Sequence, residues 1–133
     1  MNKHFILIVV FILFSCSKED NFSSKSKFAR VEETRFINII RLPEKFNKLQ
    51  INISGILNYE FENVSLYQNR WDKFRDKKEK AIWLELQNNI DLKKLECLNG
   101  KRISIIGTFN SKDKGHLNQY CGTLEEIIFL NQQ

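Results

Sequence analysis

Apolar and polar side chains alternate most regularly between residues 49 and 62. One parity carries apolar or aromatic residues and the other carries polar ones: Leu49, Ile51, Ile53, Leu57, Tyr59 and Phe61 against Gln50, Asn52, Ser54, Asn58, Glu60 and Glu62. A period of two is typical of a strand with one buried face. The run is long for a single strand, and Gly55 lies in its middle, where a bulge or sharp bend favours coiling. Ile56 is the one residue that breaks the alternation.

Four more strands are predicted further along the chain. A tight turn at Glu62 and Asn63 follows the first strand, with Asn63 as the residue suited to a positive φ. Apolar runs bounded by turn residues then predict strands over residues 64–68, 81–86, 101–109 and 120–130. Gly107 interrupts the fourth of the five strands and, like Gly55, favours a corner there.

Helical spacing occurs in two places. Between residues 33 and 42 the apolar side chains fall on one helical face, with Thr34 as a cap and Pro43 as the stop: Phe36, Ile37, Ile39 and Ile40. The second place lies between the third and fourth strands. There three leucines recur at every third position and Asn99-Gly100 follows as a stop signal: Leu92, Leu95 and Leu98. Each pattern predicts a short helix.

Three strands, a helix and two strands is the element order of the OB-fold, a small five-stranded Greek-key barrel. We therefore predict a mainly β fold: an OB-like barrel with an N-terminal helix and a short helix between strands 3 and 4 that plugs one end. A six-stranded sandwich and an α+β half-barrel stay open as alternatives. Three segments resemble those of small bacterial OB-type proteins, several of which are lipoproteins: LPEKFNKLQINISGIL, LKKLECLNGKRISIIGTF and KGHLNQYCGTLEEI. The resemblance covers residues 36–130 and implies a barrel without implying any chemistry.

The N-terminus reads as an export signal. Lys3 supplies a positive charge, and an unbroken apolar run from Phe5 to Phe14 follows, too short to span a bilayer. The tetrapeptide Leu13-Phe14-Ser15-Cys16 resembles a bacterial lipobox. That resemblance implies a signal peptide over residues 1–15, cleavage before Cys16 and lipidation of Cys16. An ordinary secretory cleavage site or a short N-terminal anchor is the alternative.

Residues 16–27 form a polar stretch after the lipobox. Their composition is typical of a flexible tether, which leaves residues 28–133 as a single OB-like domain. Lys18-Glu19-Asp20 is similar to the short signal that follows the lipidated cysteine in many surface-exposed lipoproteins of the Bacteroidota; a merely hydrophilic linker is the other interpretation. We expect the protein in the bacterial cell envelope, lipid-anchored to the outer membrane and facing either the periplasm or the surface.

The net charge of the mature chain limits the classes of ligand that it is expected to bind. The chain has a pI near 9.2, and loss of Lys3 with the signal leaves twenty basic and sixteen acidic residues, a net charge of +4. Outside the cytoplasm this charge favours anionic lipid, polysaccharide or an acidic protein, and no nucleic acid is expected.

After Cys16, two cysteines remain in the chain. Cys97 and Cys121 are an even pair in an oxidising compartment. They are either a disulfide or two buried thiols.

No catalytic constellation emerges from the sequence. His116 is the one histidine outside the signal and lies in a predicted hairpin tip, where a solvated imidazole is expected. Glu125 and Glu126 are adjacent on a strand, so their side chains are expected on opposite faces. There is no metal-binding motif and no glycine-rich phosphate loop. We therefore predict a protein that is not an enzyme and uses no metal or cofactor.

Binding is the function that remains. OB barrels bind ligands on the face of strands 2 and 3 and on the flanking loops. Residues 69–80 form a charged excursion there, read either as a solvated loop with Trp71 and Phe74 pinned to the domain or as part of a binding face. The candidate ligand-binding residues are Tyr67, Arg70, Trp71, Lys73, Phe74, Arg75 and His116, with Trp83, Lys112 and Lys114 as further candidates. We predict a non-catalytic binding or adaptor module, held on the bilayer through Cys16, for a protein or glycan. The alternative is an envelope inhibitor or immunity-type protein that caps a toxin or hydrolase.

Overall fold

The computed structural model describes residue 31 and residues 33–133. The predicted signal peptide, Cys16 and the tether over residues 16–27 lie outside the described residues. The described helices and strands, in chain order, are α2 (Phe36–Arg41), η1 (Pro43–Phe46), β1 (Gln50–Glu60), β2 (Asn63–Tyr67), α3 (Arg70–Phe74), η2 (Lys78–Lys80), β3 (Ala81–Leu84), α4 (Leu92–Leu98), β4 (Arg102–Asn110), η3 (His116–Asn118) and β5 (Gly122–Gln132).

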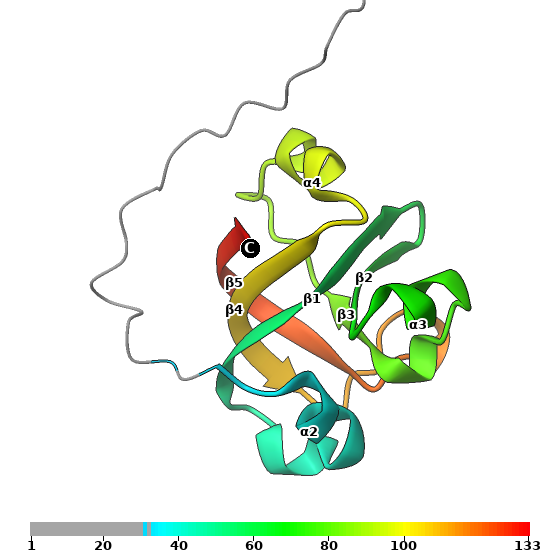
Figure 1. Ribbon diagram of the computed structural model, residues 1–133. Coiled ribbons are helices and arrows are strands. Elements are labelled where there is room, and N and C mark those ends of the chain that lie inside the picture. The colour runs from blue at the N-terminus through cyan, green and yellow to red at the C-terminus, as the bar shows by residue number, and fades with distance from the viewer. Residues whose placement is uncertain (1–30, 32) are drawn as a thin grey trace, which may run out of the picture.

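The five strands close into a barrel in the order β1-β2-β3-β5-β4, and β4 pairs back to β1 (Figure 1). β3 and β5 pair in parallel, and every other neighbouring pair is antiparallel. The first half of β1 pairs with β4 and its second half with β2, which explains why this strand is so long. The predicted OB-like barrel is confirmed, and the structure is neither a sandwich nor a half-barrel.

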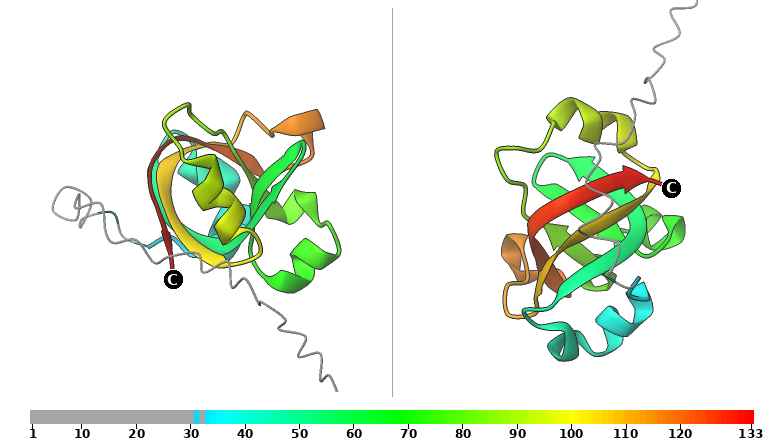
Figure 2. Two further views of the ribbon diagram at one scale, coloured as in Figure 1. Left: turned by 90° about the horizontal axis from the view of Figure 1, so that it is seen from above. Right: turned by 90° about the vertical axis from the view of Figure 1, so that its left-hand side faces the viewer.

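Helices close both ends of the barrel. α4 lies across one open end, as the view from above shows (Figure 2), and it contributes Leu95 and Leu98 to the main core. Leu92 is half exposed and does not reach that core. α2 lies at the opposite end, where Phe36 and Ile39 are buried among the strand residues. The prediction that the leucine helix plugs one end of the barrel is therefore confirmed for Leu95 and Leu98 and wrong for Leu92.

Gly55 allows β1 to pass close to β2 and α2. A Cβ atom at this position would lie 2.7 Å from both the Leu66 Cγ and the Tyr67 carbonyl oxygen, and 3.0 Å from the Phe36 ring. A larger residue would therefore push the strands apart. At the expected corner near Gly107, the pairing of β4 with β5 shifts register between Ile106 and Thr108.

A second, smaller apolar cluster lies outside the main core. Its buried members are Ile56, Tyr67, Ala81 and Tyr120, with Trp83 packed against them. Ile56 breaks the alternation of β1 because both faces of the strand are covered at this point. Ile56 and Tyr67 of this cluster also line a groove on the outside of the barrel.

Two local expectations are wrong. The turn between β1 and β2 lies at Phe61 and Glu62, and Glu62 rather than Asn63 takes the positive φ of 55°. The charged excursion contains a helix, α3, because the Asn69 side chain accepts a 2.8 Å hydrogen bond from the Asp72 amide and caps its first turn. Trp71 and Phe74 are 63% and 80% exposed, so they are not pinned to the domain.

The Cys97–Cys121 disulfide, one of the two alternatives left open by the sequence, does not form. Cys121 is a free, half-buried thiol whose backbone amide donates a 3.0 Å hydrogen bond to the Ala81 carbonyl oxygen beside β3. Cys97 is an exposed position on α4, at the end of the barrel. Burial raises the pKa of the Cys121 thiol to about 12, so this side chain is a protonated, apolar filler.

Candidate functional site

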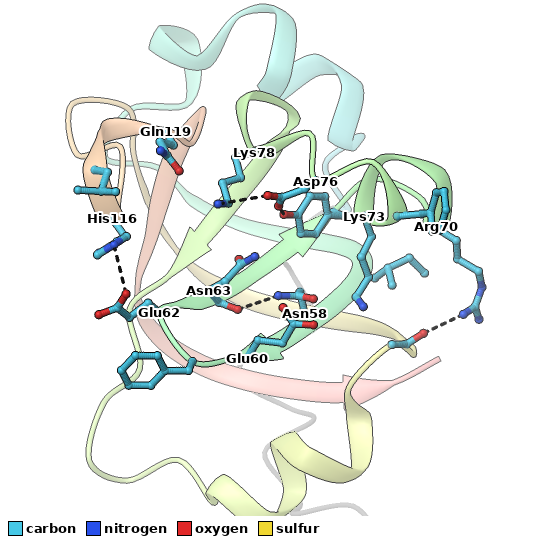
Figure 3. A pocket seen from close by; sticks show the side chains of 16 residues that line it. Asn58, Glu60, Glu62, Asn63, Arg70, Lys73, Asp76, Lys78, His116 and Gln119 are labelled. Atoms are coloured by element: carbon cyan, nitrogen blue, oxygen red, sulfur yellow. Dashed lines mark hydrogen bonds and ion pairs between the residues drawn. The ribbon is translucent and has the colours of Figure 1, made fainter.

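A groove with a volume of about 770 Å³ runs over the outer side of β1 and β2. Its volume lies within the range typical of ligand sites. The turn between β1 and β2, helix α3 and the connection between β4 and β5 surround it (Figure 3). The lining residues are Ile56, Asn58, Glu60, Phe61, Glu62, Asn63, Tyr67, Arg70, Lys73, Phe74, Asp76, Lys78, Gly100, His116, Leu117 and Gln119.

Asn63 organises the floor of the groove. Its side-chain oxygen accepts hydrogen bonds from the Ser65 hydroxyl at 2.7 Å and from the Tyr120 hydroxyl at 2.9 Å. Its backbone carbonyl accepts a third, from the Asn58 amide group at 2.8 Å. These bonds join β1, β2 and the segment before β5, so the polar floor is fixed before any ligand arrives.

Two tyrosine hydroxyls near the floor stay neutral. Tyr67 donates a 2.8 Å hydrogen bond to Asp76, which also forms an ion pair with Lys78 at 3.3 Å. Burial is the main cause that raises the pKa of Tyr67, and burial together with the Asp76 charge raises the pKa of Tyr120 to about 12. Both tyrosines are therefore hydrogen-bond donors and not bases at neutral pH.

Large apolar side chains stand exposed around the groove. Phe61 is 92% exposed, Phe74 80% and Leu117 72%. Leu117 holds a left-handed backbone conformation, with φ 55° and ψ 23°. Such a conformation is costly for a branched residue and persists where the surroundings impose it, often at functional sites. The backbone strain at Leu117 therefore lowers the free energy of unfolding, while its side chain is held exposed to solvent beside the groove.

The two loops that flank the groove meet through His116. Its Nε2 lies 3.9 Å from a Glu62 carboxylate oxygen, which links the connection between β4 and β5 to the turn between β1 and β2. The imidazole stacks on Trp83, with 6.2 Å between ring centroids. Trp83 lies beneath His116 and does not line the groove. A Cβ at Gly115 would lie 2.5 Å from two atoms of Trp83, so only glycine lets this loop approach so closely.

Lys73 brings a cation into the groove from α3. Figure 3 shows its side chain extending from the helix toward the strands that carry Asn58 and Glu60. Among the residues that the structure describes, no carboxylate forms an ion pair with its ammonium group. Arg70 on the same helix donates a 2.8 Å hydrogen bond to the Gly100 carbonyl, which fixes the helix against the loop after α4.

The structure brings most of the predicted binding residues together. Tyr67, Arg70, Lys73, Phe74 and His116 line the groove. Trp71 and Arg75 do not line it, because they lie on the outer side of α3, where the Arg75 guanidinium sits 5.6 Å from the centre of the Trp71 ring. Lys112 is paired elsewhere, with Glu44 at 2.9 Å.

Sequence reasoning missed the polar floor. Asn58 and Glu60 belong to the outward parity of β1, so the alternation itself could have pointed to them. Asn63 and Gln119 carried no comparable signal, since turn residues of these types are common in any loop.

The expectation for Glu125 and Glu126 is wrong. Glu126 has a φ of 48°, which interrupts the alternation of β5. Its carboxylate accepts a 2.9 Å hydrogen bond from Thr108, and the Glu125 carboxylate accepts one from Asn110. Thr108 and Asn110 are two residues apart on β4 and share a face, so both carboxylates lie on that face. Both are held by polar neighbours.

No protein-family model matches the chain, and no curated protein matches it. Over residue 31 and residues 33–133, no three His, Cys, Asp or Glu side chains are grouped so that they could hold a metal ion. No helix in the same part of the chain is long and apolar enough to cross a membrane.

Proposed function

We propose that this protein is a non-catalytic binding module of the bacterial cell envelope, anchored by lipid at Cys16, and that its ligand occupies the groove over β1 and β2. The observation that carries this proposal is the place of the groove. It lies between the β1–β2 turn and the β4–β5 connection, where OB barrels hold oligomeric ligands.

The chemistry of the groove supports binding. Its floor offers fixed amide groups from Asn58 and Asn63, its walls offer Lys73 and Arg70, and exposed apolar side chains stand around it. A few placed polar groups beside apolar surface are typical of sites that select a ligand. The Tyr67 hydroxyl, which lines the groove and donates its proton to Asp76, can still accept a hydrogen bond from a glycan hydroxyl or a peptide amide.

The lipobox supports the anchor. Two acyl signals hold a protein stably on a bilayer, whereas one binds reversibly. The fifteen residues from Cys16 to Arg30 can span at most about 50 Å. A domain on such a tether works close to the membrane that carries it.

Site-specific photo-cross-linking in intact cells tests the groove. A benzophenone amino acid replaces Phe61 or Leu117, which are exposed and line the groove. Leu42, which is 49% exposed and does not line the groove, is the control position. We expect the same discrete adduct from Phe61 and Leu117 and none from Leu42. Equal adducts from all three positions, or none from the two groove positions, would contradict the proposal. A toxin or hydrolase in the adduct would select the inhibitor alternative over the adaptor.

A further inference from the structure

The outer side of α3 carries a second surface, which adjoins the groove at Phe74. We call it the α3 patch and define it by Trp71, Phe74 and Arg75. The Trp71 and Phe74 rings stack with 5.8 Å between their centroids, and the Arg75 guanidinium lies over the Trp71 ring. Trp71 is 63% exposed and Phe74 80%, so the rings cover each other and little of either is buried in the domain.

The segment around the patch is strongly basic. Residues 69–80 contain six basic and three acidic side chains, a net charge of +3. The acidic groups are already engaged: the Asp72 carboxylate accepts a hydrogen bond from the Asn69 side-chain amide, Asp76 contacts Tyr67 and Lys78, and Glu79 pairs with Lys77. The positive charge of this segment therefore stays available to an external anionic surface.

We infer that the α3 patch docks on an anionic lipid bilayer, with Trp71 and Phe74 entering the headgroup region and Arg75 and its basic neighbours meeting lipid phosphates. The inference rests on the proposed anchor at Cys16, which keeps the domain within reach of a membrane. Trp suits the boundary between headgroups and acyl chains because its large ring is apolar and its N–H is polar.

The shape of the patch favours a bilayer over a protein partner. α3 stands out from the side of the barrel (Figure 1), and neither Trp71 nor Arg75 is among the residues that line the groove over β1 and β2. A stable protein interface needs about 800 Å² from each partner, with anchors that fill pockets. Two projecting rings with surrounding cations are enough for a bilayer contact, where each basic residue near the surface strengthens binding by about fivefold.

Docking through α3 also orients the groove. Phe74 belongs to the α3 patch and lines the groove, so the α3 side of the groove faces the bilayer when the patch is docked. The ligand is then held beside the membrane, within reach of groups that project from it.

Fluorescence of single-tryptophan chains tests the inference, because Trp71 and Trp83 are the two tryptophans of the protein. The full-length lipidated chain is reconstituted in vesicles of phosphatidylcholine with or without phosphatidylglycerol, some carrying brominated acyl chains. The Trp83→Phe variant reports on Trp71, and Trp71→Phe reports on Trp83 as the matched control. If Trp83→Phe fails to fold, 5-fluorotryptophan in the wild-type chain resolves the two positions by fluorine NMR.

We expect Trp71 emission to shift to the blue and to be quenched by brominated lipid in anionic vesicles, while Trp83 emission stays unchanged. Arg75→Glu should abolish most of the quenching. If Trp71 emission is not quenched in the lipidated protein, the inference is overturned, although the proposed lipid anchor at Cys16 is unaffected. A protein cross-link at Trp71 without lipid quenching would also overturn it and would assign the patch to a protein partner. Quenching of Trp71 in a chain that carries no lipid at Cys16 would support the inference and show that the patch binds the bilayer without the anchor.

Discussion

The Tyr120 hydroxyl donates a 2.9 Å hydrogen bond to the side-chain oxygen of Asn63 and so joins two segments that are 57 residues apart in sequence. Asn63 begins β2, and Tyr120 stands just before β5. Tyr120 follows the connection that carries His116 and Leu117, so the bond ties one wall of the groove to its floor.

Loss of this bond should destabilise the domain. Tyr120→Phe keeps the ring in the small apolar cluster and removes only the donor, so we expect the free energy of unfolding to fall by about 1 kcal/mol. Denaturation in urea measures the change. Tyr59→Phe is the matched control, because the Tyr59 hydroxyl has no hydrogen-bond partner among the described residues. Equal losses in the two variants would show that the Asn63 contact contributes nothing.

Stability should decline at alkaline pH. The pKa values of Tyr67 and Tyr120 are raised, the latter to about 12, from an ordinary value of 10.0. Above about pH 10 the unfolded chain therefore binds fewer protons than the folded chain, and the free energy of unfolding falls as pH rises. The stabilisation is complete below that pH and is lost between about pH 10 and 12. Urea midpoints from pH 8 to 11.5 should show this decline, and it should be shallower in a Tyr67→Phe, Tyr120→Phe double variant; a double variant as steep as wild type would contradict the assignment.

Gly55→Ala should strain the barrel. The new Cβ meets the Leu66 side chain and the Tyr67 carbonyl at 2.7 Å, and the carbonyl belongs to a paired strand that cannot move alone. We expect a loss of about 1–3 kcal/mol in the free energy of unfolding. Gly100→Ala is the comparison, since its Cβ meets nothing within 4 Å and its cost, about 1 kcal/mol, comes only from the positive φ of 77°. A smaller loss at Gly55 than at Gly100 would be contrary to the packing described.

Leu117→Gly should separate stability from binding. Glycine adopts φ 55° without strain, so the variant should unfold at the same temperature as wild type or slightly above it. Removal of the exposed side chain should still weaken ligand capture in the groove. Leu49→Gly, at a half-exposed position with no positive φ, should lower the melting temperature because glycine gains entropy in the unfolded chain. A clear loss of stability in Leu117→Gly would refute the strain attributed to this loop.

Periodicity predicted the barrel well, because it reports burial on one face of an element. The alternation of β1 and the spacing of Leu95 and Leu98 placed a strand and a plug correctly. It failed where backbone geometry departs from the regular pattern, as at Glu126, whose positive φ moves its carboxylate to the face that also holds Glu125. α3 was missed because its cap, Asn69, stands within a polar run that shows no apolar periodicity.

The groove was only half predictable. Its basic and aromatic wall is a local sequence feature, since Arg70, Lys73 and Phe74 stand within five residues. Its floor depends on the closed barrel, which brings Asn63 next to Tyr120. Contacts between residues so far apart follow from topology, and no local pattern announces them.

Metabolic labelling with palmitate, followed by protease treatment of intact cells, tests the central claim most directly, because the proposed ligand and the membrane contact both depend on where the domain resides. We predict label in the wild-type protein and none in Cys16→Ala. Digestion of the labelled protein from outside would place it on the cell surface, and protection would place it in the periplasm. A wild-type protein without label would contradict the account, and the basic barrel with its exposed aromatic side chains would then have to be tested as a binder of nucleic acid.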